Sequence, residues 1–258
     1  MKEDIMMSEW NVNQYTLFEK QRTQPAFDLV KRISDCTPHS IVDIGCGPGN
    51  STEILYHQFP DAKIIGIDSS QNMIDKARNR FPDIDFYTCD VLDLKGTYDL
   101  IFSNACLQWV PDHQTLIPFL MDHLSDHGVL AVQMPYNYEE PLYKIVNEVT
   151  SDSKWGFDKL QIEHNVTLDS RSYIEILSKC CTEFDIWETK YFHLLPNHQA
   201  LIEWIRSTKI RPYLAKLDFE KGIAFEKEIL DKAISAYPPT KNGDIIFGFR
   251  RLFFKAYK

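Results

Sequence analysis

The chain has 258 residues, of which 44% are hydrophobic and 13% aromatic, and its formal net charge is -9. This apolar content is enough for a full core at the upper end of single-domain size. The acidic balance argues against a surface for a phosphate backbone, so we expect no nucleic-acid partner. Residues 1–10 carry charges rather than an apolar run, and no stretch approaches a membrane span. We therefore expect a cytoplasmic protein with no membrane partner.

A regular alternation organises the first half of the chain. An amphipathic helix is predicted at 24–34, and short Val- and Ile-rich runs then alternate with segments of helical spacing up to residue 135. We predict strands at 40–44, 63–68, 84–88, 98–103 and 128–134. We predict helices between them at 51–59, 70–80 and 113–125. Such alternation is typical of a parallel sheet covered by helices.

The second half of the chain adds more helices to this pattern. We predict helices at 140–150 and 170–180, a strand at 184–192, three helical stretches between 197 and 237, and a final strand at 243–256. The total is seven strands in an α/β fold. Because no linker or repeat marks a second domain, we predict a single domain over residues 1–258. Segments 136–168 and 193–240 exceed a minimal fold and are expected to form a helical lid or substrate wall.

A glycine-rich turn follows the first predicted strand. Its glycines, Gly45, Gly47 and Gly49, let the backbone bend sharply and approach a ligand closely. Their G-x-G-x-G spacing differs from the G-x-x-G ending of a dinucleotide fingerprint. Pro48 also removes a backbone donor from the turn that would bind phosphate oxygens. The loop therefore predicts a nucleotide-like ligand without phosphates.

The residues after the glycines indicate the start of a helix. Asn50 with Glu53 three residues later resembles a capping box. A P-loop is excluded, because its Lys-Ser/Thr pair is absent from residues 50–52. We therefore expect a helix N-terminus beside the ligand.

Polar residues end each of the next three predicted strands. Asp68 lies 19 residues after the last glycine, where an acid in this architecture accepts hydrogen bonds from ribose hydroxyls, although the serines at 69–70 also fit a turn or helix cap. Asp90 is either an adenine contact or a strand-end cap. Asn104 begins a polar and aromatic segment beyond the fourth strand, in which Trp109 is either an active-site wall or a core aromatic.

The cysteines are scattered along the chain. They form no C-x-x-C pair, and no histidine lies at metal-ligand spacing, so we predict reduced thiols and no metal site. Cys46 lies inside the glycine loop, but no histidine near it in the sequence supports a nucleophile. The positions are Cys36, Cys46, Cys89, Cys106, Cys180 and Cys181.

Together these stretches resemble the class I S-adenosylmethionine-dependent methyltransferases, and the D-x-G-C-G-x-G run starting at Asp43 is fairly specific to that class. The sequence more closely resembles the trans-aconitate 2-methyltransferase family. Matching motifs span nearly the whole chain, at 10–11, 45–52, 66–70, 107–109, 111–113, 128–135, 185–187, 198–200, 211–212 and 251–253.

The resemblance implies a Rossmann-like, doubly wound, seven-stranded sheet whose last strand is antiparallel, with a cofactor-binding core at 39–135. It also implies methyl transfer from S-adenosylmethionine to a carboxylate of a small polycarboxylic acid, giving a monomethyl ester and S-adenosylhomocysteine. No obligatory protein partner is inferred. The candidate cofactor-binding residues are Asp43, Gly45, Cys46, Gly47, Asn50, Asp68, Ser69, Met73, Asp90, Val91, Asn104, Leu107 and Trp109.

A carboxylate acceptor sets simple chemical requirements. Its pKa of about 4 leaves it ionised at neutral pH, so no general base and no catalytic side chain is predicted. Aromatic side chains would enclose the sulfonium group of the cofactor. Arginine guanidinium groups would bind the carboxylates of the acceptor that are not methylated. Strand alternation allows only one of Arg250 and Arg251 to face the site. The candidate substrate-binding residues are Tyr15, Arg22, Gln108, Tyr136, Tyr191, His193, Arg211 and Arg251.

Three alternatives remain open from the sequence. One is a methyltransferase of a malonyl thioester on a carrier protein, which would need a basic docking face that the acidic composition disfavours. Another is an NAD-dependent oxidoreductase, which the glycine spacing and Pro48 oppose. The third is a binding module that holds the cofactor without turnover.

Overall fold

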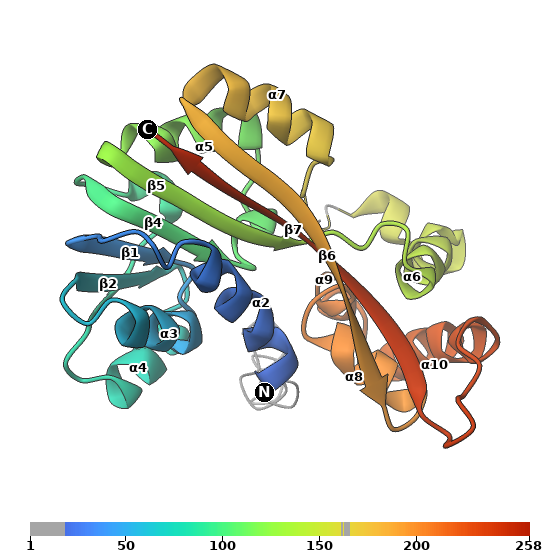
Figure 1. Cartoon of the computed structure of the whole chain (residues 1–258). Helices are drawn as coiled ribbons and strands as arrows, with labels where there is room; N and C mark the ends of the chain where they lie inside the picture. The colour runs from blue at the N-terminus through green and yellow to red at the C-terminus, as the bar shows by residue number, and fades with distance from the viewer. Residues whose placement is uncertain (1–18, 161, 163–165) are drawn as a thin grey trace. The chain divides into compact units, whose positions relative to one another are not determined.

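The computed structural model describes residues 19–160, 162 and 166–258, and its central feature is a mixed sheet of seven strands (Figure 1). The strand order is β3-β2-β1-β4-β5-β7-β6. Each strand lies where the sequence predicts one, which confirms the seven-stranded α/β fold. The strands are β1 (Ser40–Ile44), β2 (Lys63–Asp68), β3 (Asp85–Thr88), β4 (Tyr98–Asn104), β5 (Leu124–Pro135), β6 (Glu183–Leu195) and β7 (Ile245–Tyr257).

The strand directions create a ligand-binding edge. β1 pairs in parallel with β2 and β4, β2 pairs in parallel with β3, and β4 pairs in parallel with β5. β7 pairs antiparallel with β5, so that Pro135 lies opposite Arg251. The expected antiparallel last strand is thereby confirmed. The carboxyl ends of β1 to β5 meet along one edge, where ligands of such sheets bind.

Helices cover both faces of the sheet (Figure 1). The hydroxyls of Ser51 and Thr52 in α3 donate to Asp43 of β1, so α3 lies against the face that carries Asp43. On the other face, the ring of Tyr173 in α7 packs against Phe254 of β7, with centroids 5.5 Å apart. The helices are α2 (Glu19–Arg32), α3 (Asn50–Gln58), α4 (Gln71–Arg80), α5 (His113–Asp122), α6 (Pro141–Ser151), α7 (Ser170–Cys180), α8 (Gln199–Arg206), α9 (Arg211–Leu214) and α10 (Phe219–Ala236).

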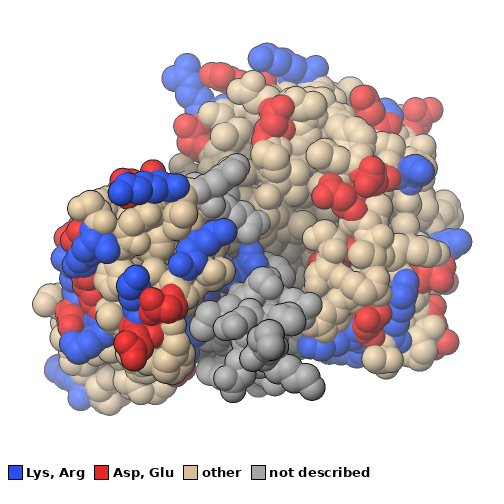
Figure 2. Space-filling view, turned by 180° about the vertical axis from the view of Figure 1, so that it is seen from behind, with Lys and Arg blue, Asp and Glu red and all other residues tan. Residues whose placement is uncertain are grey.

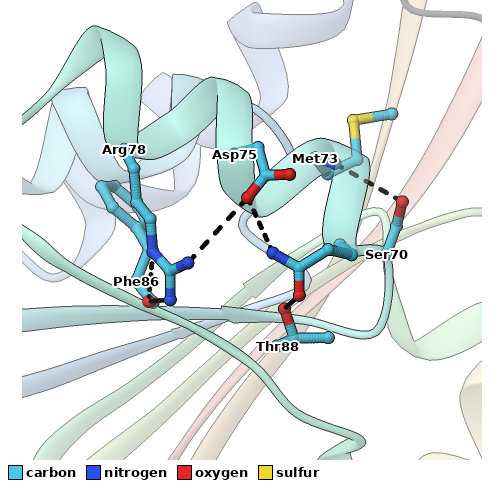
Figure 3. Close-up of polar contacts among 7 residues, drawn as sticks. Ser70, Met73, Asp75, Arg78, Phe86 and Thr88 are labelled. Atoms are coloured by element: carbon cyan, nitrogen blue, oxygen red, sulfur yellow. Dashed lines mark hydrogen bonds and ion pairs between the residues drawn. The ribbon is translucent and has the colours of Figure 1, made fainter.

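Side-chain hydrogen bonds fix α4 to β3 (Figure 3). Arg78 donates through Nε and Nη2 to the carbonyl of Phe86, at 3.1 and 2.6 Å. The hydroxyl of Thr88 donates to Gln71 Oε1 at 2.7 Å. These bonds hold the first turn of α4, which Ser70 caps, beside the carboxyl end of β2.

The connection between α5 and β5 differs from the prediction. The helix ends at Asp122, and the strand begins at Leu124, four residues earlier than expected. Leu120 and Leu124 recur at helical spacing, but Leu124 is paired with Tyr98 in the sheet. His127 then adopts a left-handed φ of 66°. This irregular residue in a polar stretch hides the start of β5 from its sequence pattern.

The chain forms two compact units, and β6 and β7 each continue from one unit to the other. We call them the sheet unit and the helical unit. The helical unit has its own aromatic core, in which Trp204 packs against Phe247 and Phe249. None of the described helices is both long and apolar enough to cross a membrane. Of the described residues, the sheet unit comprises 22–135, 166–189 and 251–258, and the helical unit comprises 19–21, 136–160, 162 and 190–250.

Candidate active site

The glycine loop leaves β1 and turns toward β2. The N–H groups of Gly45 and Cys46 both donate to the carbonyl of Ile67, at 2.8 and 3.0 Å. Gly45, Gly47 and Gly49 have φ values of 69°, 55° and 93°, which favour glycine because a side chain is strained there. A Cβ on Gly47 would meet no atom within 4 Å. The loop therefore has a tightly held start and open space at its centre.

The predicted capping box is wrong. Gly49 is the N-cap of α3, and no side chain caps this helix. The side chain of Asn50 instead accepts a hydrogen bond from Arg80 of α4. Glu53 pairs with the same arginine at 2.7 Å. Arg80 lies 30 residues from Asn50 in the chain, so the local motif carried no sign of this competing partner.

Asp43 is a fully buried carboxylate beside the loop. Its Oδ2 accepts hydrogen bonds from the hydroxyls of Ser51 and Thr52, both at 2.7 Å. Burial raises the pKa of Asp43 to about 6, against the lowering effect of these two hydroxyls. Its Oδ1 has no hydrogen-bond partner among the described residues. An orphaned anionic oxygen of this kind suits a cationic ligand.

Asp68 links the end of β2 to the glycine loop. Its Oδ2 accepts a hydrogen bond from Gly47 N at 3.0 Å, and its Oδ1 accepts one from Ser70 N at 2.8 Å. Burial raises its pKa. Each carboxylate oxygen keeps further lone-pair capacity. Asp68 therefore makes the turn that its neighbouring serines suggested and can still accept hydrogen bonds from a ligand.

The other cofactor candidates of β2 and β3 lie at the same edge. Ser69 follows Asp68 directly, and Met73 is buried in the first turn of α4. Asp90 caps the 3-10 turn η1 (Val91–Asp93) by accepting a hydrogen bond from Leu92 N at 2.9 Å. Val91 behind it is buried. The cap at Asp90 is therefore present, and its carboxylate is exposed.

The segment after β4 is anchored by a buried histidine. Leu107 is buried in the 3-10 turn η2 (Leu107–Trp109), and its carbonyl lies 2.8 Å from His113 Nε2. A carbonyl only accepts, so Nε2 must carry the proton, and Nδ1 accepts from the hydroxyl of Tyr173. Burial lowers the pKa of His113, in agreement with a neutral ring. Trp109 is held half-buried in this turn.

The thiols near the edge are poor nucleophiles. Burial raises the pKa of Cys46, and burial together with Asp68, Asp43 and Asp90 raises the pKa of Cys106 to about 12. The same three carboxylates give this edge a negative potential. Such a potential favours a cationic ligand and opposes a pyrophosphate.

The substrate candidates fall in different parts of the chain. Gln108 is buried in the sheet unit, where its Nε2 donates to the carbonyl of Ala105 at 2.7 Å. Arg251 also belongs to the sheet unit and is buried. Arg22 belongs to α2, but its side chain lies outside the described residues, as does the whole of Tyr15.

The remaining four candidates belong to the helical unit. His193 is buried between aromatic rings and stacks on Trp204 with centroids 4.7 Å apart. Tyr191 stacks parallel to His193, and Tyr136 packs edge-on against Tyr138. Arg211 is the first residue of α9 and is partly buried.

Comparison with known proteins supplies the class of this site. Residues 41–128 match the family model described as a methyltransferase domain. A trans-aconitate 2-methyltransferase of Yersinia pestis (strain Pestoides F) is 39% identical over 255 residues, which cover 97% of this chain and 99% of that protein. The chain belongs to the trans-aconitate 2-methyltransferase family.

Solved structures agree on the fold. The YcgJ protein of Bacillus subtilis superposes with a TM-score of 0.62 at 16% identity, covering 91% of this chain and 98% of that one. A phosphoethanolamine N-methyltransferase 2 of Haemonchus contortus, solved with S-adenosylhomocysteine, superposes with a TM-score of 0.57 at 18% identity, covering 91% of this chain and 52% of that one.

Membership of this family decides between several predictions. It confirms an S-adenosylmethionine-dependent methyltransferase with the class I fold. It leaves the NAD-dependent oxidoreductase without support. The orphaned Asp43 oxygen, the open space at Gly47 and the negative edge all fit a cationic, phosphate-free cofactor.

Replacing Asp68 by alanine tests the ribose assignment. The change removes a carboxylate that can accept bonds from two hydroxyls, so we expect S-adenosylmethionine to bind at least about tenfold more weakly. Calorimetric titration with the cofactor measures this loss. Asp85→Ala is the matched control. Asp85 is exposed at the amino end of β3, away from the ligand-binding edge, and its variant should keep the wild-type affinity. Equal affinities of Asp68→Ala and wild type would remove the ribose role.

Proposed function

We propose that this enzyme methylates a carboxylate of trans-aconitate, giving the monomethyl ester and S-adenosylhomocysteine. The observation that carries the proposal is the near full-length similarity to trans-aconitate 2-methyltransferases. The chemistry of the described site supports it. A carboxylate is already ionised at neutral pH, and the buried thiols and the neutral His113 offer no strong base at this edge.

Positioning is the main contribution that we assign to the chain. Bound S-adenosylmethionine supplies an electrophilic methyl group on a sulfonium. The carboxylates of Asp43 and Asp68 hold the cationic cofactor at the ends of β1 and β2. The ring of Trp109 packs beside the sulfonium group of the cofactor. Orientation of two reactants can lower the barrier by about 7–11 kcal/mol. No proton needs to leave the acceptor, which agrees with the absence of a predicted catalytic base.

The arginines Arg211 and Arg251 are proposed to hold the carboxylates that are not methylated. A planar guanidinium matches a carboxylate with two parallel hydrogen bonds. Arg250 is only partly buried, whereas Arg251 is 5% exposed and points to the opposite face of β7. We therefore assign Arg251 rather than Arg250 to the acceptor. Tyr136, Tyr191 and His193 are proposed as the aromatic and neutral polar contacts.

Alanine at Arg211 or at Arg251 should raise the KM for the acceptor by about 10- to 100-fold, because each change removes a charge-assisted bond. Affinity for S-adenosylmethionine should stay within about twofold of wild type. Steady-state kinetics and calorimetry separate the two quantities. Arg171→Ala, an exposed arginine of α7, is the control. A parallel loss of cofactor affinity would make the two arginines structural.

A malonyl thioester on a carrier protein remains the alternative acceptor. An acidic carrier would dock on a basic face. On the face drawn in Figure 2, the Lys and Arg side chains of the described residues are interspersed with Asp and Glu rather than gathered into a basic region. The described residues of this face (Figure 2) therefore offer no basic docking surface for an acidic carrier.

A panel assay tests the proposal. The purified enzyme is incubated with S-adenosylmethionine and one of trans-aconitate, cis-aconitate, isocitrate, itaconate or a malonyl thioester, and release of S-adenosylhomocysteine is measured. We expect the highest kcat/KM with trans-aconitate. Release with the thioester alone would assign the enzyme to the carrier-protein alternative, and no release with any acid would contradict carboxylate methylation.

A further inference from the structure

Gln133 is a buried polar residue of β5 whose side-chain amide makes no hydrogen bond to the part of the chain that the structure describes. Its side chain is 0% exposed, and neither Oε1 nor Nε2 has a hydrogen-bond partner among the described residues. A side-chain amide can donate two hydrogen bonds and accept two, and the large majority of buried polar atoms are paired. Phe253, which pairs with Gln133 from β7 and shares its face of the sheet, is fully buried and apolar. Folding alone would favour an apolar residue at Gln133.

Gln133 ends a row of polar side chains on one face of the sheet. Asp43 pairs with Phe102, two residues before Asn104, and Asn104 pairs with Gln133. Paired residues of parallel strands share a face, so Asp43, Asn104 and Gln133 all lie on the face that α3 covers. The Oδ1 atoms of Asp43 and Asn104 are also buried without partners among the residues described. The row runs from the glycine loop to β5 near the carboxyl ends.

The difference in charge between the two ends of this row suits a cationic ligand at one end and an anionic ligand at the other. Asp43 provides a carboxylate at the β1 end, whereas Gln133 provides a neutral amide at the β5 end. Two strand spacings, about 10 Å, separate these strands. An anionic ligand is repelled by Asp43 and gains amide donors at Gln133. The charge difference along the row therefore favours an anionic acceptor at the β5 end and the cationic cofactor at the β1 end.

Arg251 adds a positive charge beside Gln133. Pairing of β5 with β7 sets Phe253 opposite Gln133 and Arg251 opposite Pro135. Gln133 and Arg251 are therefore diagonal neighbours on the same face, with Cα atoms about 7–8 Å apart. A guanidinium and an amide N–H group side by side can both donate hydrogen bonds to one carboxylate, and the bonds from the guanidinium are charge-assisted.

We propose that the amide of Gln133 donates a hydrogen bond to a carboxylate of the acceptor, next to Arg251, and so helps to select an anionic acceptor. This role rests on the proposed carboxylate methylation and names one more residue of that site. Binding of the acceptor satisfies an amide that the described residues leave without a hydrogen bond. The sequence signal was a single glutamine within the apolar run 128–135.

Replacing Gln133 by methionine, which has a similar shape and no donor, is the first test. We expect the Kd of trans-aconitate, measured by calorimetry with S-adenosylhomocysteine present, and its KM to rise about 10- to 100-fold. Affinity for S-adenosylmethionine should not change. The Tm of the free protein should rise by about 2–4 °C, because an unsatisfied buried amide is removed. Gln58→Met, the same change at an exposed site, is the control for both readouts.

Replacing Gln133 by glutamate adds a second measurement, the pH dependence of the acceptor KM, which would not change if Gln133 had only a structural role. An ionised glutamate repels the acceptor carboxylate, whereas a protonated glutamate regains a donor. The ratio of the variant KM to the wild-type KM should therefore fall steeply as the pH is lowered from 8 toward 5. A pH-independent ratio would contradict contact with an anion.

The outcomes separate this inference from the proposed function. If the wild type methylates no acid of the panel, carboxylate methylation itself fails. If the wild type is active and Gln133→Met has an unchanged acceptor KM, only the role of Gln133 fails. A loss of cofactor affinity in Gln133→Met, with the acceptor KM unchanged, would move the residue to the cofactor site and also overturn the inference.

Discussion

Gly45→Ala is expected to abolish cofactor binding and to destabilise the fold. The residue has a φ of 69°, and a Cβ there would lie 2.2 Å from Cys106 Cβ and 2.3 Å from Cys106 Sγ. Left-handed backbone and overpacking together cost about 2–5 kcal/mol. We expect the Tm to fall by roughly 5–15 °C and the affinity for S-adenosylmethionine to fall by more than about 100-fold. Thermal unfolding and calorimetry measure the two effects.

Gly156→Ala is the matched control for this change. Gly156 has the same φ of 69°, but a Cβ there would meet no atom within 4 Å. Its alanine variant should therefore lose only the backbone contribution, about 1–2 kcal/mol, and keep its cofactor affinity. Equal destabilisation of the two variants would show that the close approach of Gly45 to Cys106 is unimportant.

Asp43→Asn is expected to stabilise the free protein and to weaken cofactor binding. The pKa of Asp43 is about 6 in the folded protein, against an ordinary value of 3.8. The folded state therefore binds the proton more strongly, and stability falls as the pH rises from about 4 through 6. This shift corresponds to about 3 kcal/mol at neutral pH, which the asparagine variant should largely recover. Unfolding in urea at pH 5 and pH 8 measures the difference.

The same carboxylate should make cofactor binding depend on pH. A cationic ligand favours ionised Asp43, so wild-type affinity for S-adenosylmethionine should increase as the pH rises through 6. Asp43→Asn should bind about tenfold more weakly at pH 8, with a flatter pH profile. Burial also raises the pKa of Asp68, so the cofactor affinity of Asp43→Asn should still change slightly with pH.

Asp99→Asn is the control with the opposite sign. Asp99 lies near the amino end of β4, where bonds from Ser125, His39 and Ser40 hold its pKa below its ordinary value. Its stabilisation is present above that ordinary value and is lost as the pH falls through the lowered pKa. The variant should therefore be less stable at neutral pH and bind the cofactor normally. A stable Asp99→Asn and a destabilised Asp43→Asn would contradict these electrostatic assignments.

The sheet was predictable because its signals are local. The buried strands β1, β2 and β4 are short runs with an apolar centre, and each is followed by a turn and a helical pattern. The glycine loop was identified from spacing alone, because positive φ values at Gly45, Gly47 and Gly49 require this residue type. The acids Asp68 and Asp90 followed from their places at strand ends.

Features that depend on distant residues were harder to predict. Arg80 draws Asn50 and Glu53 away from the expected capping box, although it belongs to another helix. Leu124 is predicted in a helix because it lies four residues after Leu120. The spacing of apolar residues does not reveal that Leu124 pairs with Tyr98 in the sheet. That the buried amide of Gln133 finds no hydrogen-bond partner among the residues described is visible only when the packing around β5 is known. Patterns report local geometry, whereas partners and burial come from the packed fold.

The most direct test of the central claim follows the methyl group itself. The enzyme is incubated with trans-aconitate and S-adenosylmethionine carrying a ¹³C methyl group, and the product is examined by NMR before and after mild base. A labelled methyl ester of trans-aconitate that base converts back to the free acid is the predicted result. Label in a base-stable product, or no label on the acid while S-adenosylhomocysteine is released, would contradict carboxylate methylation.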